Sequence, residues 1–231
     1  MKRLILPVLL LLMITGCATS ENPSELSVVT TSYVTFDLAR EVIGEEAVTL
    51  LIKPGADAHT FEPTAQDMVT IENADLMIYT NPDMEPWVES LSSDSTILLN
   101  ASQGIVLLAT EEDDHHDHEE DDHSHDEDDD HDHAHDPHTW TSMKNAQIMV
   151  SNIRDKISEI DPDNADKYND NAERIINELK ELDESYQTVF NEAEVDTIVF
   201  LGHFGLNYLM HDYDMEYIAL FESMSHESEP T

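Results

Sequence analysis

A run of charged residues divides this chain and limits what it can fold into. Of the 26 residues 111–136, 16 are Asp or Glu, 8 are His, and only Ser124 and Ala134 are neither. Such a stretch has almost no apolar surface to bury against the entropy of ordering its backbone, so we expect it to be a disordered loop. Imidazoles and carboxylates at one- to three-residue spacing also form a flexible, multidentate ligand for borderline divalent metals. A solvated acidic linker is the alternative, but such a linker has no need of eight imidazoles.

The net charge narrows the choice of partners. The chain of 231 residues has 10 Lys and Arg against 51 Asp and Glu, a formal charge of −41. Outside the run the chain still has 35 acidic residues and all 10 of its basic residues. This excess of negative charge excludes nucleic acid as a binding partner and excludes electrostatic attraction to anionic lipid. It favours cationic partners.

The first 17 residues have the pattern of a processed leader. Lys2 and Arg3 precede an apolar run at 4–14, which is too short to span a bilayer because a spanning helix needs ~20 residues. The run closes on Ile14-Thr15-Gly16-Cys17, which resembles the lipobox of prokaryotic lipoproteins. That resemblance implies cleavage before Cys17, lipidation of its sulfur and attachment outside the cell membrane, followed by a tether at 18–26. A soluble secreted protein with an incidental Cys17 is the alternative.

Buried strands and helices alternate before the charged run. Cys17 is the only cysteine, so the mature fold has neither a disulfide nor a thiolate metal site. β-Branched or apolar segments predict strands at 27–31, 47–52, 76–79 and 96–99, and helical periodicity predicts helices at 33–43, 64–72 and 84–91. This alternation predicts a parallel α/β sheet in an N-terminal lobe at 27–163.

A long helix and a short second lobe follow the run. A helix is predicted at 145–160, and residues 165–190 contain neither Gly nor Pro, so this second helix can run unbroken for ~40 Å. It forms the centre of a linking segment at 164–193. Residues 194–231 then offer two strands, at 195–201 and 217–221, around a helix at 206–210. Because a two-stranded unit is marginally stable alone, we expect this C-terminal α/β lobe to be incomplete, either truncated or completed by something else.

Three histidines outside the run are placed where a parallel sheet positions ligands, in loops after the carboxyl ends of strands. His59 follows the second strand, His138 lies in Asp136-Pro137-His138-Thr139-Trp140, and His203 follows the strand at 195–201. Three neutral imidazoles suit Zn²⁺ and leave one tetrahedral position open. We therefore predict that His59, His138 and His203 form the metal site.

The segments around these histidines resemble a known family, the metal-binding solute-binding proteins of ABC transporters for zinc and manganese, which include adhesin-type lipoproteins. The motifs that match are Gly55-x-x-x-His59-x-Phe-Glu-Pro, Asp136-Pro137-His138-x-Trp140 and the segment 203–213, in the family's order, with an acidic His-rich loop before the second. The resemblance implies two α/β lobes joined by a long rigid helix, with the metal held between them by the three matching histidines. It also implies a monomeric extracytoplasmic receptor, anchored at the cell membrane, that delivers its metal to an ABC permease.

Zinc is favoured over manganese within that family. Manganese binders resemble this pattern but usually have Glu at the third position and lack the His-rich loop, whereas this chain has His203 and the loop. A nitrogen-rich site also prefers Zn²⁺ to the harder Mn²⁺. The acidic fourth ligand common in the family falls beyond residue 231, so the fourth ligand is water, a loop residue such as Asp57 or Glu222, or a carboxylate missing from this sequence. His211 and His226 are expected to be surface residues.

Three functions remain in competition. The first is a Zn²⁺ receptor in which the run serves as an accessory metal loop through His115, His116, His118, His123, His125, His131, His133 and His135. The second is a zinc hydrolase, since three His ligands and an open position also describe a catalytic site. The sequence lacks His-Glu-x-x-His, however, and offers only Glu62 near His59 as a base. The third is a passive metal buffer or a nonfunctional fragment. We expect a binding protein and not an enzyme.

Overall fold

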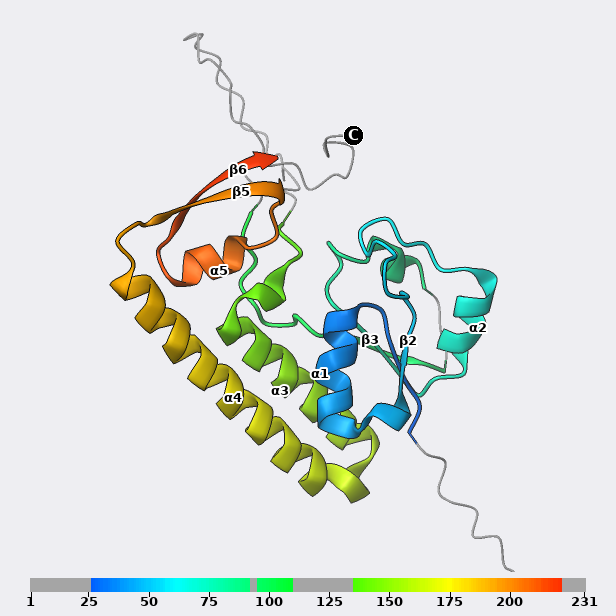
Figure 1. Ribbon diagram of the computed structural model, residues 1–231. Helices are drawn as coiled ribbons and strands as arrows, with labels where there is room; N and C mark the ends of the chain where they lie inside the picture. Colours follow the sequence, from blue (N-terminus) through cyan, green and yellow to red (C-terminus); the bar gives the residue numbers. More distant parts are fainter. Residues whose placement is uncertain (1–25, 92–94, 110–134, 222–231) are drawn as a thin grey trace, which may run out of the picture.

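A parallel four-stranded sheet forms the centre of the first half of the chain. The computed structural model describes residues 26–91, 95–109 and 135–221. Its strands are β1 (Val28–Thr30), β2 (Val48–Leu50), β3 (Leu76–Tyr79) and β4 (Ile97–Asn100), in the order β2-β1-β3-β4 and all parallel (Figure 1). The predicted parallel α/β class is confirmed.

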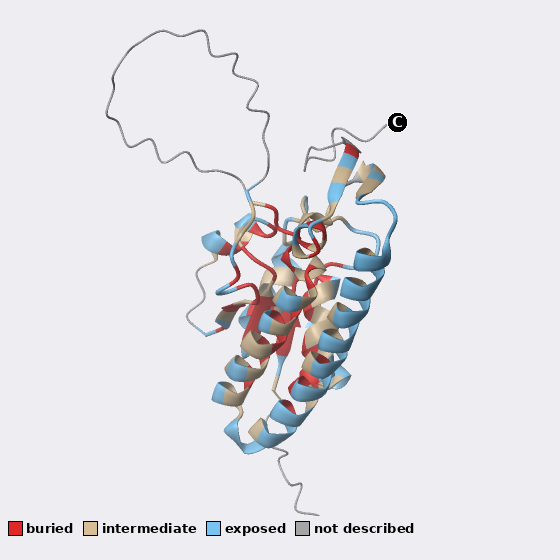
Figure 2. Ribbon diagram, turned by 90° about the vertical axis from the view of Figure 1, so that its left-hand side faces the viewer, coloured by how far each residue is buried: buried red, intermediate tan, exposed pale blue. Residues whose placement is uncertain are grey.

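Helices cover both faces of this sheet. On one face pack α1 (Tyr33–Ile43), α3 (Met143–Ile160) and the long α4 (Ala165–Glu192); on the other pack α2 (Ala65–Glu72) and the 3₁₀ helix η2 (Pro86–Ser90). Because successive side chains of a strand point to opposite faces, Val28 packs under the first group of helices and Val29 under the second. The buried residues accordingly gather between the sheet and the helices, while the outer side of α4 is exposed (Figure 2).

Side-chain caps set where several helices begin. Ser32 caps α1 and Thr64 caps α2. In each case the side-chain oxygen accepts a hydrogen bond from the backbone N–H three residues later, and the side chain of that later residue bonds back to the cap, which completes a capping box. Ser142 caps α3 with its hydroxyl oxygen, which accepts from the backbone N–H of Asn145 at 3.1 Å. The helix therefore begins at Met143, slightly earlier than its apolar periodicity predicted.

The prediction of a helix at 84–91 is wrong. The structure has only the 3₁₀ helix η2 there. Pro86 disfavours helical backbone at the residue before it, and Glu85 has φ −126° and ψ 68°. The remaining short elements are the 3₁₀ helices η1 (Glu45–Ala47), η3 (Thr139–Thr141) and η4 (Pro162–Asn164).

A second, two-stranded parallel sheet follows α4. It consists of β5 (Thr197–His203) and β6 (Glu216–Phe221), with α5 (Asn207–Asp212) between them. The sequence predicted that His203 lies in the loop after this strand, and that is wrong: His203 is the last residue of β5. Its backbone pairs with Phe221 beyond an irregularity in the register, and this pairing extends the strand.

The two faces of the second sheet differ. Ile198 and Phe200 pack with Phe204 and Met210, which secures the sheet against α5. Val199 and Leu201 on the opposite face are 64% and 77% exposed. The second sheet is thus packed on one side only within the described residues.

Hydrogen bonds of α5, and of Tyr213 directly after it, join the second sheet to the His138 segment, the start of α3 and the helix α4. The Tyr208 hydroxyl donates to the Asp136 carbonyl at 2.8 Å, and the Ser142 hydroxyl donates to Asp212 Oδ2 at 2.5 Å. The Tyr213 hydroxyl donates to Asp183 Oδ1 of α4 at 2.8 Å. The end of β5 is thereby held beside the Asp136-Pro137-His138 segment.

None of the described helices is both long and apolar enough to cross a membrane. The predicted leader with Cys17 and nearly all of the tether lie outside the described residues, as do His226, Glu222 and every histidine of the run except His135.

Candidate metal centre

His138 is held in one orientation by the aspartate two residues before it. Its backbone N–H and its ring Nδ1 both lie in hydrogen-bonding range of Asp136 Oδ1, at 2.9 and 2.7 Å, and both residues are buried. A carboxylate only accepts hydrogen bonds, so Nδ1 carries the proton and Nε2 presents its lone pair. A carboxylate behind a histidine in this way is the usual second partner of a metal-binding imidazole.

His59 approaches the same point from the loop between β2 and α2. Its backbone N–H donates to Asp57 Oδ1 at 3.0 Å, which shapes the loop locally. The Nε2 atoms of His59 and His138 lie 3.2 Å apart. Two nitrogens bound to one tetrahedral Zn²⁺ at ~2.0–2.1 Å would be about 3.3 Å apart. The pair therefore already has the spacing of two ligands of a single zinc ion.

The loop directly after β5 approaches His138 through its backbone. His203 is followed by a loop in which a Cβ placed on Gly205 would lie 3.0 Å from Cδ2 of the His138 ring. Residue 205 therefore touches His138, and glycine permits this close approach. The His203 imidazole is not among the described side chains. Within the described part of the chain, no three His, Cys, Asp or Glu side chains form a group able to hold a metal ion.

The other predicted residues that the structure describes form no metal-holding group with this pair. Asp57 accepts hydrogen bonds within its own loop, from His59 N and from the Thr60 hydroxyl at 3.2 Å. His211 is exposed on α5, as expected, and Glu62 is exposed. His135 pairs with Ala109 in an isolated antiparallel bridge, so the described residues on either side of the segment 110–134 lie next to each other, one residue from Asp136.

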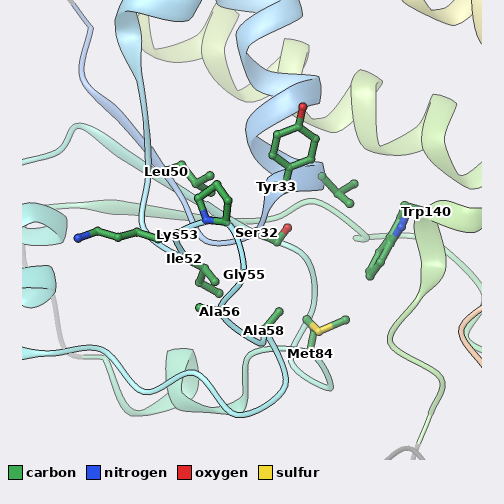
Figure 3. Close-up of a pocket in the computed structure, with 12 residues that line it drawn as sticks. Ser32, Tyr33, Leu50, Ile52, Lys53, Gly55, Ala56, Ala58, Met84 and Trp140 are labelled. Atoms are coloured by element: carbon green, nitrogen blue, oxygen red, sulfur yellow. The ribbon is translucent and has the colours of Figure 1, made fainter. Parts of the chain in front are cut away.

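The loop that bears His59 lies over a cavity of about 310 Å³. Gly55 and Ala58 of the loop form one wall, and Tyr33, Met84 and Trp140 contribute to the others (Figure 3). The Trp140 ring also meets the His138 ring edge to face, with centroids 5.3 Å apart. His138 is thus packed and hydrogen-bonded, whereas the loop of His59 has open space behind it.

Sequence reasoning missed several groups that surround His138. The spacing Asp-x-His was visible in the sequence, but its role as the Nδ1 partner was not inferred. Tyr208 donates to the Asp136 carbonyl and accepts from Leu108 N at 3.1 Å. Burial raises the pKa of the Tyr208 hydroxyl to about 12, so it stays a donor at neutral pH. Asn81 and Glu85 gave no signal of this role in the sequence, because the bonds of Asn81 to Pro137 and of Glu85 to Thr31 span 56 and 54 residues.

Two imidazoles that meet beyond the strand ends of a parallel α/β fold, one of them held by a carboxylate, form an arrangement typical of metal-binding proteins. Residues 28–231 match the model of the family described as zinc-uptake complex component A, periplasmic. The zinc-binding protein AdcA of Streptococcus pyogenes is 32% identical over 205 residues, and the high-affinity zinc uptake system protein ZnuA of Bacillus subtilis is 34% identical over 221. The Zn(II)-bound ZnuA-like domain of Streptococcus pneumoniae AdcA is 29% identical, with a TM-score of 0.70 over 85% of this chain and 67% of that one.

The chain belongs to this zinc-uptake family. The alignments cover 85% of it with AdcA and 94% with ZnuA, but only 39% and 66% of those two relatives. The predicted family is confirmed.

Proposed function

We propose that this protein is an extracytoplasmic receptor that binds Zn²⁺ and delivers it to the permease of an ABC transporter. The observation that carries the proposal is the 3.2 Å approach of the His59 and His138 Nε2 atoms, with Asp136 fixing the proton of His138 on the other nitrogen. Two imidazole nitrogens at this separation suit a borderline cation, which would replace the proton that His59 Nε2 donates to His138 Nε2. The relatives' names, which describe zinc binding and zinc uptake, support the same metal.

His203 is the proposed third ligand. Its backbone position at the end of β5, two residues before the glycine that touches His138, supports this role. We propose that residues 27–163 and 194–231 belong to two lobes joined by the segment 164–193, with zinc held between them. The fourth ligand is then water or a carboxylate, and the protein works as a monomer tethered through lipidated Cys17.

The charged run is proposed to collect zinc for this site. The described residues that lead into and out of it lie side by side next to His138, since Ala109 pairs with His135 and Asp136 N donates to the Leu108 carbonyl at 2.9 Å. Many weak ligands on one loop raise the local concentration of metal without holding it tightly. Binding, and not catalysis, is the proposed activity, and the relatives' names, which describe zinc binding and zinc uptake, support this choice over a hydrolase.

A competition titration of the full chain tests the proposal. We expect one Zn²⁺ per chain to resist a strong chromophoric chelator, with further zinc ions released easily, and we expect the metal-free chain to bind Mn²⁺ only weakly. A passive buffer would show only the weak class of sites. A manganese receptor would bind one Mn²⁺ tightly when the metal-free chain is titrated with Mn²⁺ alone. Either result would contradict the proposed function.

A further inference from the structure

Glu85 is a fully buried carboxyl group that joins two strands of the first sheet. Its oxygens accept hydrogen bonds from the hydroxyls of Thr31, at 2.5 Å, and Thr80, at 3.0 Å. They also accept from the backbone N–H groups of Thr80, at 3.1 Å, and Asn81, at 3.2 Å. Thr31 directly follows β1 and Thr80 directly follows β3, so Glu85 ties together the carboxyl ends of the two central strands.

A buried carboxyl is a costly way to join two strands. All four of these donors are neutral, and burial raises the pKa of Glu85 while the hydrogen bonds from Thr31, Asn81 and Thr80 oppose that rise. An apolar side chain would fill the same space without the cost of removing a carboxyl from water. What Glu85 supplies, and an apolar residue does not, is a fixed backbone at Thr80 and Asn81.

Asn81 extends this hydrogen-bonded network to the metal centre. It is 1% exposed. Its side-chain Oδ1 accepts from Met84 N at 2.9 Å, which sets the orientation of its amide group. Its Nδ2 donates to the carbonyl of Pro137 at 2.8 Å, and Pro137 is bonded directly to His138. Asn81 is therefore the link between the end of β3 and the backbone of His138.

A second tether holds the other side of His138. The hydroxyls of Thr139 and Ser102 share a hydrogen bond of 2.8 Å, and Ser102 lies just after β4. The backbone is thus fixed to the sheet both before and after His138. The loop of His59, in contrast, lies over the cavity shown in Figure 3.

We propose that Asn81, oriented by Glu85, is a positioning residue for zinc binding. By holding the Pro137 carbonyl it fixes His138 as the rigid half of the site, to which His59 and the end of β5 adjust when the metal binds. This inference rests on the proposed function, and it assigns a role to a residue that does not itself contact the metal.

Substitution of Asn81 tests the role, with a matched change elsewhere in the chain. Asn81→Asp keeps the acceptor for Met84 N and removes the donor to Pro137. Asn81→Leu removes that donor without adding a charge. Asn171→Asp is the control, because Asn171 Nδ2 likewise donates to a backbone carbonyl, that of Val42, at 2.9 Å between α4 and α1. All three changes are expected to lower the thermal unfolding midpoint.

Zinc affinity and the His138 ring signal separate positioning from simple destabilisation. Both Asn81 variants are expected to bind zinc about tenfold more weakly, the lower end of the range for groups that orient ligands. They are also expected to shift the NMR signal of the His138 ring in the metal-free protein, which is identified by its loss in His138→Ala. Asn171→Asp should change neither. Wild-type affinity and ring signal in both Asn81 variants, or an equal loss in Asn171→Asp, would overturn the inference. If the wild type has no tight zinc site, the proposed function fails and the ring signal alone decides the role of Asn81.

Discussion

Replacing His59, His138 and His203 together with alanine is expected to lower the affinity of the tight site for zinc by roughly a thousandfold or more. Zinc bound at structural sites gains ~10–16 kcal/mol in total from about four ligands, so the loss of three removes most of it. The eight histidines of the run remain in this variant. Weak binding of several zinc ions should therefore persist after the tight ion is gone.

A chelator competition at neutral pH measures this loss, with the circular dichroism of the metal-free variant as a check on folding. The reciprocal variant replaces the eight run histidines with asparagine and keeps the dispersed three. It should retain one tight zinc ion and lose the weak ones. Tight binding that survives the triple change and disappears in the reciprocal variant would place the site in the run.

Replacing Asp136 with alanine is expected to weaken zinc binding by up to about a hundredfold, the upper end of the range for a carboxylate behind a metal-binding histidine. The change removes the acceptor that both the His138 backbone N–H and Nδ1 use. The ring then loses its fixed orientation and its preference for a lone pair on Nε2. The Tyr208 hydroxyl donates to the backbone carbonyl of residue 136 and keeps its partner.

Asp83→Ala is the control for the lost charge. Asp83 Oδ1 lies 3.8 Å from His135 Nδ1, close to the same segment, yet it is not hydrogen-bonded to His138. We expect isothermal titration to show a small change for this variant and an intermediate loss for Asp136→Asn, whose amide oxygen still accepts from Nδ1. An equal loss in Asp83→Ala and Asp136→Ala would mean that only the net charge near the site matters.

Local patterns in the sequence were enough to predict most of the fold. The bounds of α1 and β3 agree with the predicted ranges, because the caps, the Gly44 stop and the apolar runs that define them lie within a few residues of each other. The prediction failed at 84–91, where the backbone restriction imposed by Pro86 outweighs an apolar periodicity. It also failed at His203, whose place in β5 depends on pairing with a strand that follows later in the chain.

The candidate site was predictable only in part, because contacts between residues far apart in the chain leave no local pattern in the sequence. Parallel strands place their carboxyl ends together, so the approach of His59 and His138 followed from the order of the strands. The groups that orient His138 act across long separations in the chain: Asn81 bonds to Pro137, and Tyr208 bonds to Asp136. Neither contact leaves a periodic or local pattern in the sequence, so only the structure shows them.

The most direct test of the account is the zinc X-ray absorption spectrum of the chain in which all eight run histidines are asparagine, loaded with one Zn²⁺ and freed of excess metal. The account predicts a four- or five-coordinate zinc with three imidazole nitrogens at ~2.0–2.1 Å and the remaining positions filled by oxygen. A chain that holds no zinc after this treatment, or a spectrum with fewer than two imidazoles, would contradict it.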